Sequence, residues 1–241
     1  MPTERTIRVF PSPQVVASAA ADLIVQQAAR SIESTGRFSL TLSGGSTPKI
    51  LYELLAAEPY RSNLDWTKIE IFFGDERCVP PDNEQSNYRM ANEALLSKVP
   101  LRSENIHRMH GETDPEAAAI EYGRLLKAKF GDAGPDLILL GMGPDGHTAS
   151  LFPETSALDE QAHRCVANYV PKFSAWRLTM TAPFINRAHC IAALIAGAEK
   201  GPIVKQVLEQ PPDAVRFPIQ LIQPSAGQFF WFLDAAAAGM D

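Results

Sequence analysis

The stretch DLILLGMGPDGHTAS, residues 136–150, joins a short apolar run, a glycine-rich turn and a histidine. The run from Asp136 to Leu140 has the composition of a buried strand. The three glycines of the turn can bring the backbone close to a ligand, because no Cβ stands in the way. His147 ends the turn, and its side-chain type exchanges protons near neutral pH. A strand that presents a histidine in this way is typical of a reactive site in an α/β protein.

The same turn permits two other interpretations. Gly141-x-Gly143-x-x-Gly146 has the spacing of a dinucleotide-binding loop. That loop requires a helix directly after it, whereas Pro144 lies inside the motif and Pro153 ends any helix that follows. The second alternative is a tight turn whose histidine only caps a helix. The turn alone leaves that alternative open.

Composition predicts a soluble globular protein. The chain has 241 residues, 45% hydrophobic and 21% charged, and its net charge of -6 argues against general nucleic-acid binding. We find no apolar run of membrane-spanning length and expect no signal peptide. The cysteines at positions 78, 165 and 190 follow no zinc-site spacing, and we therefore expect a reduced, cytoplasmic protein without a bound metal.

Apolar periodicity predicts alternating strands and helices along the whole chain. The expected strands are 7–10, 38–43, 68–73, 106–109, 136–140, 164–170, 176–181, 190–195 and 228–234, and the expected helices are 14–33, 49–57, 86–96, 115–130, 183–187 and 202–208. Alternation of this kind favours a largely parallel sheet covered on both faces. No linker or internal repeat interrupts it, so we predict a single domain over residues 1–241.

Two strand ends carry further candidate site residues. After the strand at 38–43, Gly44 and Gly45 precede two hydroxyl residues and Pro48, which suits the first position of a helix with Ser46 or Thr47 as its N-cap. Free N–H groups at such a helix start bind phosphate, although a plain capped turn has the same sequence. The strand at 68–73 runs into the charged Gly74-Asp-Glu-Arg77, which is either a site or a solvated loop.

Asn87 and a histidine pair complete the candidates from single motifs. Asn87 opens the helix at 86–96, and it either caps this helix or points back toward the charged strand end. His107 and His110 lie near Glu112, but they fall in a loop instead of on one helix face. We therefore predict no metal there.

Four motifs together resemble a known family. They are Ser43-Gly-Gly-Ser-Thr-Pro48, Gly74-Asp-Glu-Arg77 with Ser86-Asn-Tyr88, Gly141-x-Gly-x-Asp-Gly-His147, and Arg177-Leu-Thr-Met-Thr181. Their order and spacing are similar to those of the 6-phosphogluconolactonase family, and the similarity extends from Ser43 to the apolar strand that ends at Asp234. The resemblance implies the Rossmann-like three-layer α/β/α sandwich that these enzymes share with glucosamine-6-phosphate deaminases.

The resemblance also implies an activity and its residues. The activity is hydrolysis of 6-phospho-D-glucono-1,5-lactone to 6-phospho-D-gluconate in the oxidative pentose phosphate pathway, with no cofactor and no nucleic-acid or membrane partner. His147 corresponds to the general base, Asp145 would orient it or its loop, and Arg77 would contact the substrate or stabilise developing negative charge. The implied substrate and phosphate contacts are Gly44, Gly45, Ser46, Thr47, Asp75, Asn87, Arg177 and Lys200. A monomer and a small homo-oligomer both remain open.

Two alternatives stand beside this activity. A deaminase on the same fold usually has an aromatic residue where this chain has Arg77, and it needs a glutamate where this chain has Phe152. Phe152 cannot relay a proton. A non-catalytic sugar-phosphate-binding regulator would not need His147. The chain departs from the lactonase pattern at Gly201, where the family usually has Ala after the lysine.

Overall fold

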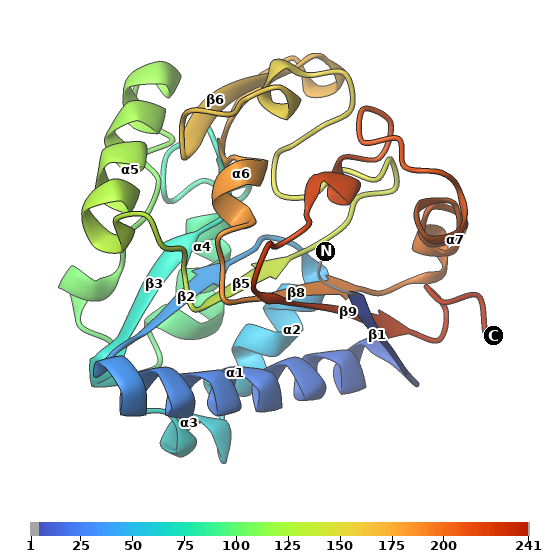
Figure 1. Ribbon diagram of the computed structural model, residues 1–241. Helices are drawn as coiled ribbons and strands as arrows, with labels where there is room; N and C mark the ends of the chain where they lie inside the picture. Colours follow the sequence, from blue (N-terminus) through green and yellow to red (C-terminus); the bar gives the residue numbers. More distant parts are fainter. Residues whose placement is uncertain (1–4, 241) are drawn as a thin grey trace.

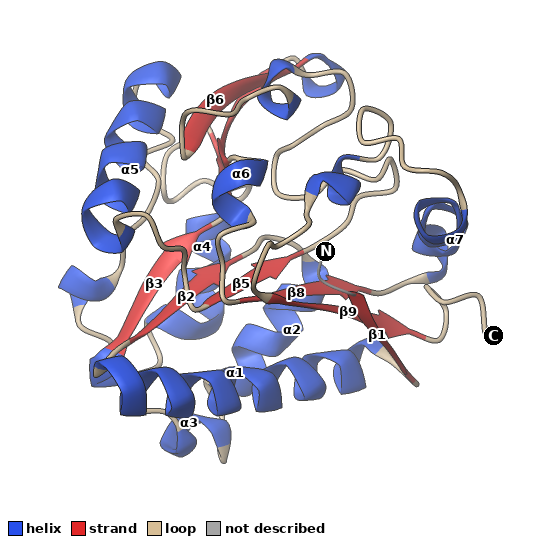
Figure 2. Ribbon diagram, in the orientation of Figure 1, coloured by secondary structure: helices blue, strands red, loops and turns tan. Residues whose placement is uncertain are grey.

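The computed structural model describes residues 5–240, and a six-stranded parallel sheet runs through its centre (Figures 1 and 2). Its strand order is β1-β9-β8-β5-β2-β3. The bounds are β1 Arg5–Phe10, β2 Phe38–Leu42, β3 Ile69–Phe73, β5 Leu137–Leu140, β8 Cys190–Ile195 and β9 Gln228–Asp234. Every residue of β2, β5 and β8 is buried. These strands are buried on both faces, which explains why their sequences are continuous apolar runs.

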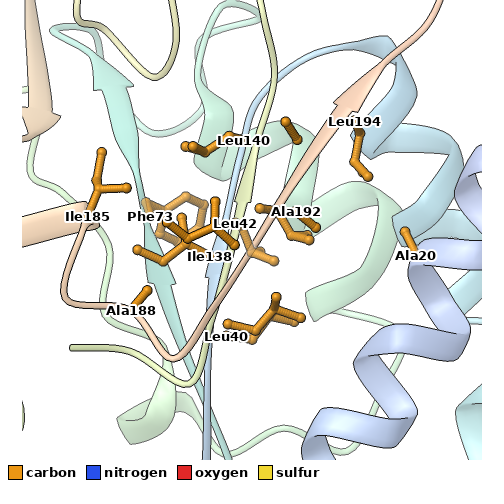
Figure 3. Packing of buried hydrophobic residues seen from close by; sticks show 14 of the residues in the cluster. Ala20, Leu40, Leu42, Phe73, Ile138, Leu140, Ile185, Ala188, Ala192 and Leu194 are labelled. Carbon is orange, nitrogen blue, oxygen red and sulfur yellow. The ribbon is translucent and has the colours of Figure 1, made fainter. Parts of the chain in front are cut away.

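Helices cover both faces of this sheet, so the predicted three-layer α/β/α architecture is confirmed (Figure 1). Phe72 of β3 contacts Phe130 at 4.9 Å between ring centroids, and Phe130 contacts Phe184 at 6.0 Å. Phe130 belongs to α5 (Pro115–Phe130) and Phe184 to α6 (Ala182–Ile185), so both helices lie on the face of the sheet to which Phe72 points. Leu40 and Leu42 lie out of phase with Phe72 and point to the other face, toward α1 (Pro13–Thr35), as Figure 3 shows with Ala20.

The remaining helices are shorter. They are α2 (Ser46–Leu55), α3 (Tyr60–Asn63), α4 (Asn87–Ala91) and α7 (Gly201–Glu209). Local signals set several helix ends: Asp114 caps α5 through a 2.9 Å bond from Ala117 N, and Gly36 ends α1 with φ +80°. The helix predicted at 86–96 is α4 continued by a π-helical turn, Asn92–Leu96. Within residues 5–240, no helix is long and apolar enough to cross a membrane.

A second, three-stranded antiparallel sheet was not predicted. It consists of β4 (Asp75–Arg77), β7 (Ala175–Met180) and β6 (Cys165–Val170), in that order. β6 and β7 were expected as strands, and the short connection between them permits only antiparallel pairing. β4 was expected as a turn or charged loop, because three residues without apolar alternation carry no strand signal. Its backbone pairs with β7, where Arg77 lies opposite Arg177.

The strand predicted at 106–109 is wrong. A single parallel bridge joins Ile106 to Ile71, and His107 N donates to Ile71 O at 2.9 Å. The segment then leaves the edge of β3, with Tyr122 Oη donating to His107 O at 3.2 Å. The segment 106–109 therefore forms one bridge, between Ile106 and Ile71, and no strand.

Candidate active site

A cleft of about 580 Å³ opens at the carboxyl ends of β2, β5 and β8. Parallel α/β sheets place ligands at this edge. Of the residues predicted for the site, all but Asp145 line the cleft: Gly44, Gly45, Ser46, Thr47, Asp75, Arg77, Asn87, His147, Arg177 and Lys200. Asp145 lies directly behind His147. The fold thus brings together five segments that are far apart in the sequence: 44–47, 75–87, 145–147, 177 and 200.

The turn after β2 presents the start of helix α2 to the cleft. This helix begins at Ser46, three residues earlier than predicted, and its N-cap is Gly45 with φ +113°. The predicted hydroxyl cap is therefore wrong: Gly45 has no side chain, and the N-terminus has no side-chain cap. Lys49 N makes the first intrahelical bond, to Gly45 O at 3.1 Å. The N–H groups of the first turn are left for a ligand, as phosphate binding at a helix start requires.

Gly44 is required because Asn87 lies against it. A Cβ at Gly44 would come within 2.0 Å of Asn87 Oδ1. Asn87 Nδ2 donates to Asp75 O at 2.9 Å and to Asp75 Oδ1 at 3.2 Å, so Asn87 does reach back from α4 to the charged strand end. Ser86 caps α4 instead, through a bond from Arg89 N. Ser150 Oγ donates to Asp75 Oδ2 at 2.6 Å, which fixes both oxygens of this buried carboxylate.

Glu76 anchors the loop that carries Asn87. Its carboxylate is almost fully buried and accepts hydrogen bonds from the backbone N–H groups of Arg77, Asn87 and Tyr88 at 2.7–2.8 Å. Ser86 Oγ donates a fourth at 3.0 Å. Burial raises the pKa of Glu76, while the four donors favour its ionised form. Glu76 therefore holds the start of α4 against β4 and does not itself line the cleft.

The turn after β5 positions His147. Gly143 N donates to His147 O at 2.8 Å, and Gly146 adopts φ +76°. A Cβ at Gly143 would come within 2.0 Å of the His147 ring. The ring stacks on Phe152, with centroids 4.0 Å apart and an interplanar angle of 25°. No helix follows this turn, and the next helical segment, Ser156–Leu158, begins after Thr155. Neither the dinucleotide loop nor the capping histidine fits this geometry.

Asp145 fixes the His147 ring from behind. Asp145 Oδ1 lies 2.5 Å from His147 Nδ1, and Asp145 Oδ2 lies 2.9 Å from Lys172 Nζ. Burial works to raise the pKa of Asp145, but the hydrogen bonds from His147 and Lys172 prevail and hold it well below its usual range. The carboxylate is therefore ionised at neutral pH, which favours a proton on Nδ1. Nε2 has no hydrogen-bond partner within residues 5–240 and is the nitrogen available to a ligand.

Three cationic side chains enter the same cleft. Arg77 and Arg177 are cross-strand neighbours on β4 and β7, and Lys200 ends the short 3-10 turn after β8. Arg77 donates to the backbone carbonyl of Gln85. Burial, and then the nearby Arg77, lower the pKa of Arg177 from its ordinary value. Like charges held this close favour an anionic ligand between them.

Several residues that line or adjoin the cleft were not predicted, among them Ser150, Phe173 and Gln85 of the lining and Lys172, which contacts Asp145. Ser150 belongs to the quoted stretch but had no signal of its own, because its contact with Asp75 spans 75 residues. Phe152 was used only to argue against a deaminase, and its stacking on His147 was not foreseen. Among residues 5–240, no group of three or more His, Cys, Asp or Glu side chains could hold a metal ion. The three cysteines are free.

Comparisons with known proteins agree with this geometry. The family model described as glucosamine-6-phosphate isomerases/6-phosphogluconolactonase matches residues 11–231. A 6-phosphogluconolactonase of Nostoc sp. is 41% identical over 240 residues, covering 97% of each chain. The devB protein structure has a TM-score of 0.89 and 36% identity over 98% of this chain and 99% of its own. The Trypanosoma cruzi 6-phosphogluconolactonase has a TM-score of 0.86 and 29% identity, over 99% and 97% of the two chains. This chain therefore belongs to the glucosamine-6-phosphate isomerase/6-phosphogluconolactonase family.

Proposed function

We propose that this protein is a 6-phosphogluconolactonase, which hydrolyses 6-phospho-D-glucono-1,5-lactone to 6-phospho-D-gluconate in the oxidative pentose phosphate pathway. One observation carries the assignment within the family. His147 has Nδ1 bound to Asp145 and, among residues 5–240, no partner on Nε2, and it lies in the same cleft as a helix N-terminus without a side-chain cap. A base and a phosphate site in one cleft suit a phosphorylated lactone. The Nostoc relative, which the chain matches over nearly its whole length, bears the same name.

The phosphate end of the substrate binds at the β2 turn. The first N–H groups of α2 and the Lys200 ammonium supply donors and positive charge there. The sugar ring then extends toward His147, past Asp75 and Asn87, whose polar atoms suit its hydroxyl groups. Anchoring the non-reacting phosphate positions the carbonyl carbon for attack, which converts binding energy into orientation.

The chemistry needs a base, a stabilised oxyanion and an acid. His147 Nε2 takes a proton from a water as the water oxygen attacks lactone C1. The C1=O electrons move to oxygen, and the cationic Arg77 or Arg177 stabilises that oxyanion. When the oxyanion collapses, the bond from C1 to the ring oxygen breaks, and the imidazolium returns its proton to the ring oxygen. Positioned proton transfer of this kind contributes about 10²–10⁴-fold.

The deaminase alternative requires a glutamate at position 152, where this chain has the non-titratable Phe152. Phe152 stacks on His147 and is buried, so it excludes water beside the ring without exchanging protons. A regulator that only binds sugar phosphates would not need His147 to be oriented by Asp145, whose Oδ1 lies 2.5 Å from Nδ1. This contact therefore favours an enzyme. We also infer a cytoplasmic location from the three free cysteines, and a single domain spanning residues 1–241.

Hydrolysis of the lactone tests the proposal. Purified protein, with no added cofactor, is expected to speed disappearance of 6-phosphogluconolactone well above its spontaneous rate in the same buffer. Equal rates with and without protein would contradict the assignment. Glucosamine 6-phosphate is assayed in parallel for ammonia release. We expect none, and release of ammonia would move the protein to the deaminase branch.

A further inference from the structure

We propose that Lys172, in the segment Pro171–Phe173 that joins β6 to β7, is a positioning residue for His147. This inference rests on the proposed function, in which His147 is the general base. The segment is a 3-10 turn at the tip of the small antiparallel sheet, outside the glycine-rich turn that carries His147. This hairpin of β6 and β7 reaches His147 in two ways, through an ion pair with Asp145 and through a chain of aromatic contacts. They are called the ionic route and the aromatic route.

The ionic route runs through Asp145. Lys172 Nζ lies 2.9 Å from Asp145 Oδ2, and the other oxygen of the same carboxylate holds His147 Nδ1. One carboxylate therefore joins a lysine of the hairpin to the candidate base. Asp145 and His147 are only about a quarter exposed, whereas Lys172 is 54% exposed. Solvent weakens the lysine end of this route, but the carboxylate end lies in a setting of lower dielectric.

The aromatic route runs through Phe173. Its ring meets Phe152 edge-on, with centroids 5.6 Å apart and an interplanar angle of 82°. Phe152 in turn stacks on the His147 ring. Lys172 Nζ and Arg177 Cζ both lie 5.6 Å from the Phe173 ring centroid. The hairpin thus restrains the imidazole at Nδ1 and on one face, which fixes the direction of Nε2.

Lys172 also changes the charge that His147 experiences. A carboxylate beside an imidazole favours the imidazolium, which cannot act as a base. Lys172 offsets that effect by neutralising Asp145 on its far oxygen. The other charged groups of the cleft are Asp75, Arg77, Arg177, Glu199 and Lys200, and a change at position 172 leaves all five in place. The lysine therefore offsets part of the carboxylate charge beside the ring, while Asp145 still holds the ring in place.

The pH dependence of kcat/KM tests this role with matched variants. Lys172→Met keeps the apolar stem and removes the charge, and its acidic limb should move to higher pH by about half to one unit. Activity on that limb should fall about 3- to 10-fold, in proportion to the shift. Lys172→Arg should keep the limb of the wild type. Lys68→Met is the control, because Lys68 is 49% exposed and pairs with Asp65 far from the cleft. An unmoved limb in Lys172→Met, or an equal shift in Lys172→Arg, overturns the inference.

Nuclear magnetic resonance of the His147 ring separates this inference from the proposed function. The ring nitrogens, assigned by their loss in His147→Gln, should titrate at a higher midpoint in Lys172→Met than in wild type. In an Asp145→Asn background, Lys172→Met should add no further shift, and an equal shift there would overturn the route through Asp145. A shifted midpoint in a protein without lactonase activity would leave the positioning role and remove the function. Lactonase activity with an unshifted midpoint would do the reverse.

Discussion

Two glycine-rich turns, after β2 and after β5, lie at the same edge of the sheet and present different groups to the cleft. The first is Gly44–Thr47 and continues directly into α2, so its N–H groups point along a helix axis. The second is Gly141–His147, and a series of turns follows it instead of a helix. The first offers backbone donors for an anion, and the second offers a side chain held by a carboxylate.

The difference comes from what each glycine makes room for. Gly44 leaves space for Asn87, which belongs to another element, whereas Gly143 leaves space for the ring of His147 in its own turn. In the first turn, Gly45 ends the loop without a capping side chain, so the helix start remains available. Glycine content alone therefore says little about function. The segment that follows, and the side chain that fills the space, decide which ligand group binds.

Replacing His147 should have the largest effect on the second turn. His147→Ala removes the proposed base and should lower kcat by about 10²–10⁴-fold. The ring is 23% exposed and caps no helix, so we expect the melting temperature to change little. Steady-state kinetics and a thermal melt measure the two quantities. Full activity in this variant would remove the general-base role.

Gly143→Ala should come next, because it displaces the base without removing it. The added Cβ would come within 2.0 Å of the His147 ring and must break either its stacking or its bond to Asp145. A misplaced catalytic group costs on the order of 10²-fold in kcat. Gly74→Ala is the matched control, since its Cβ meets only ordinary contacts at 3.6 Å and beyond. A kcat equal to that of the control would show that the ring position is not critical.

Lys200→Ala should affect the phosphate end only. In the proposed binding mode the ammonium contacts the non-reacting phosphate, so KM should rise by roughly ten-fold, the effect of one charged hydrogen bond, while kcat stays nearly constant. Inorganic phosphate, as a competitive inhibitor, should weaken in the same proportion. A fall in kcat without a change in KM would instead place Lys200 near the reacting carbonyl.

The sequence predicted elements with local signals and missed those defined by distant partners. Helix α5 begins and ends as predicted, since Asp114 and Pro115 mark its start and Gly131 follows its end. The buried strands β5 and β8 were predicted from their apolar runs. By contrast, β4 exists only because β7, about a hundred residues later, supplies its hydrogen bonds. The early start of α2 depends on backbone conformation at Gly45, which two adjacent glycines leave undetermined.

The same distinction holds for the candidate site. Most of the predicted residues lie at a strand end or in its turn, where the fold class alone brings the side chains together. Asn87 at the start of α4 and Arg177 within β7 are exceptions. Lys172 and Phe173 lie on a hairpin tip, and no local pattern shows that this tip folds over His147. The bond from Ser150 to Asp75 likewise depends on how the two sheets are joined. Strand-end motifs therefore predicted most of the residues that line the cleft, and the supporting contacts required coordinates.

Gly44→Ala should give the smallest effect and separates the two turns most directly from one another. Its Cβ would come within 2.0 Å of Asn87 Oδ1, the end of a side chain that can move at the expense of two hydrogen bonds to Asp75. Two such bonds, partly replaced by water, correspond to roughly a few-fold to ten-fold rise in KM. Since Nε2 of His147 is untouched, kcat should stay close to wild type, in contrast to Gly143→Ala. If Gly44→Ala lowered kcat as strongly as Gly143→Ala, the two turns would not divide binding from proton transfer, and Asp75 would have to act on the reacting carbonyl through Asn87.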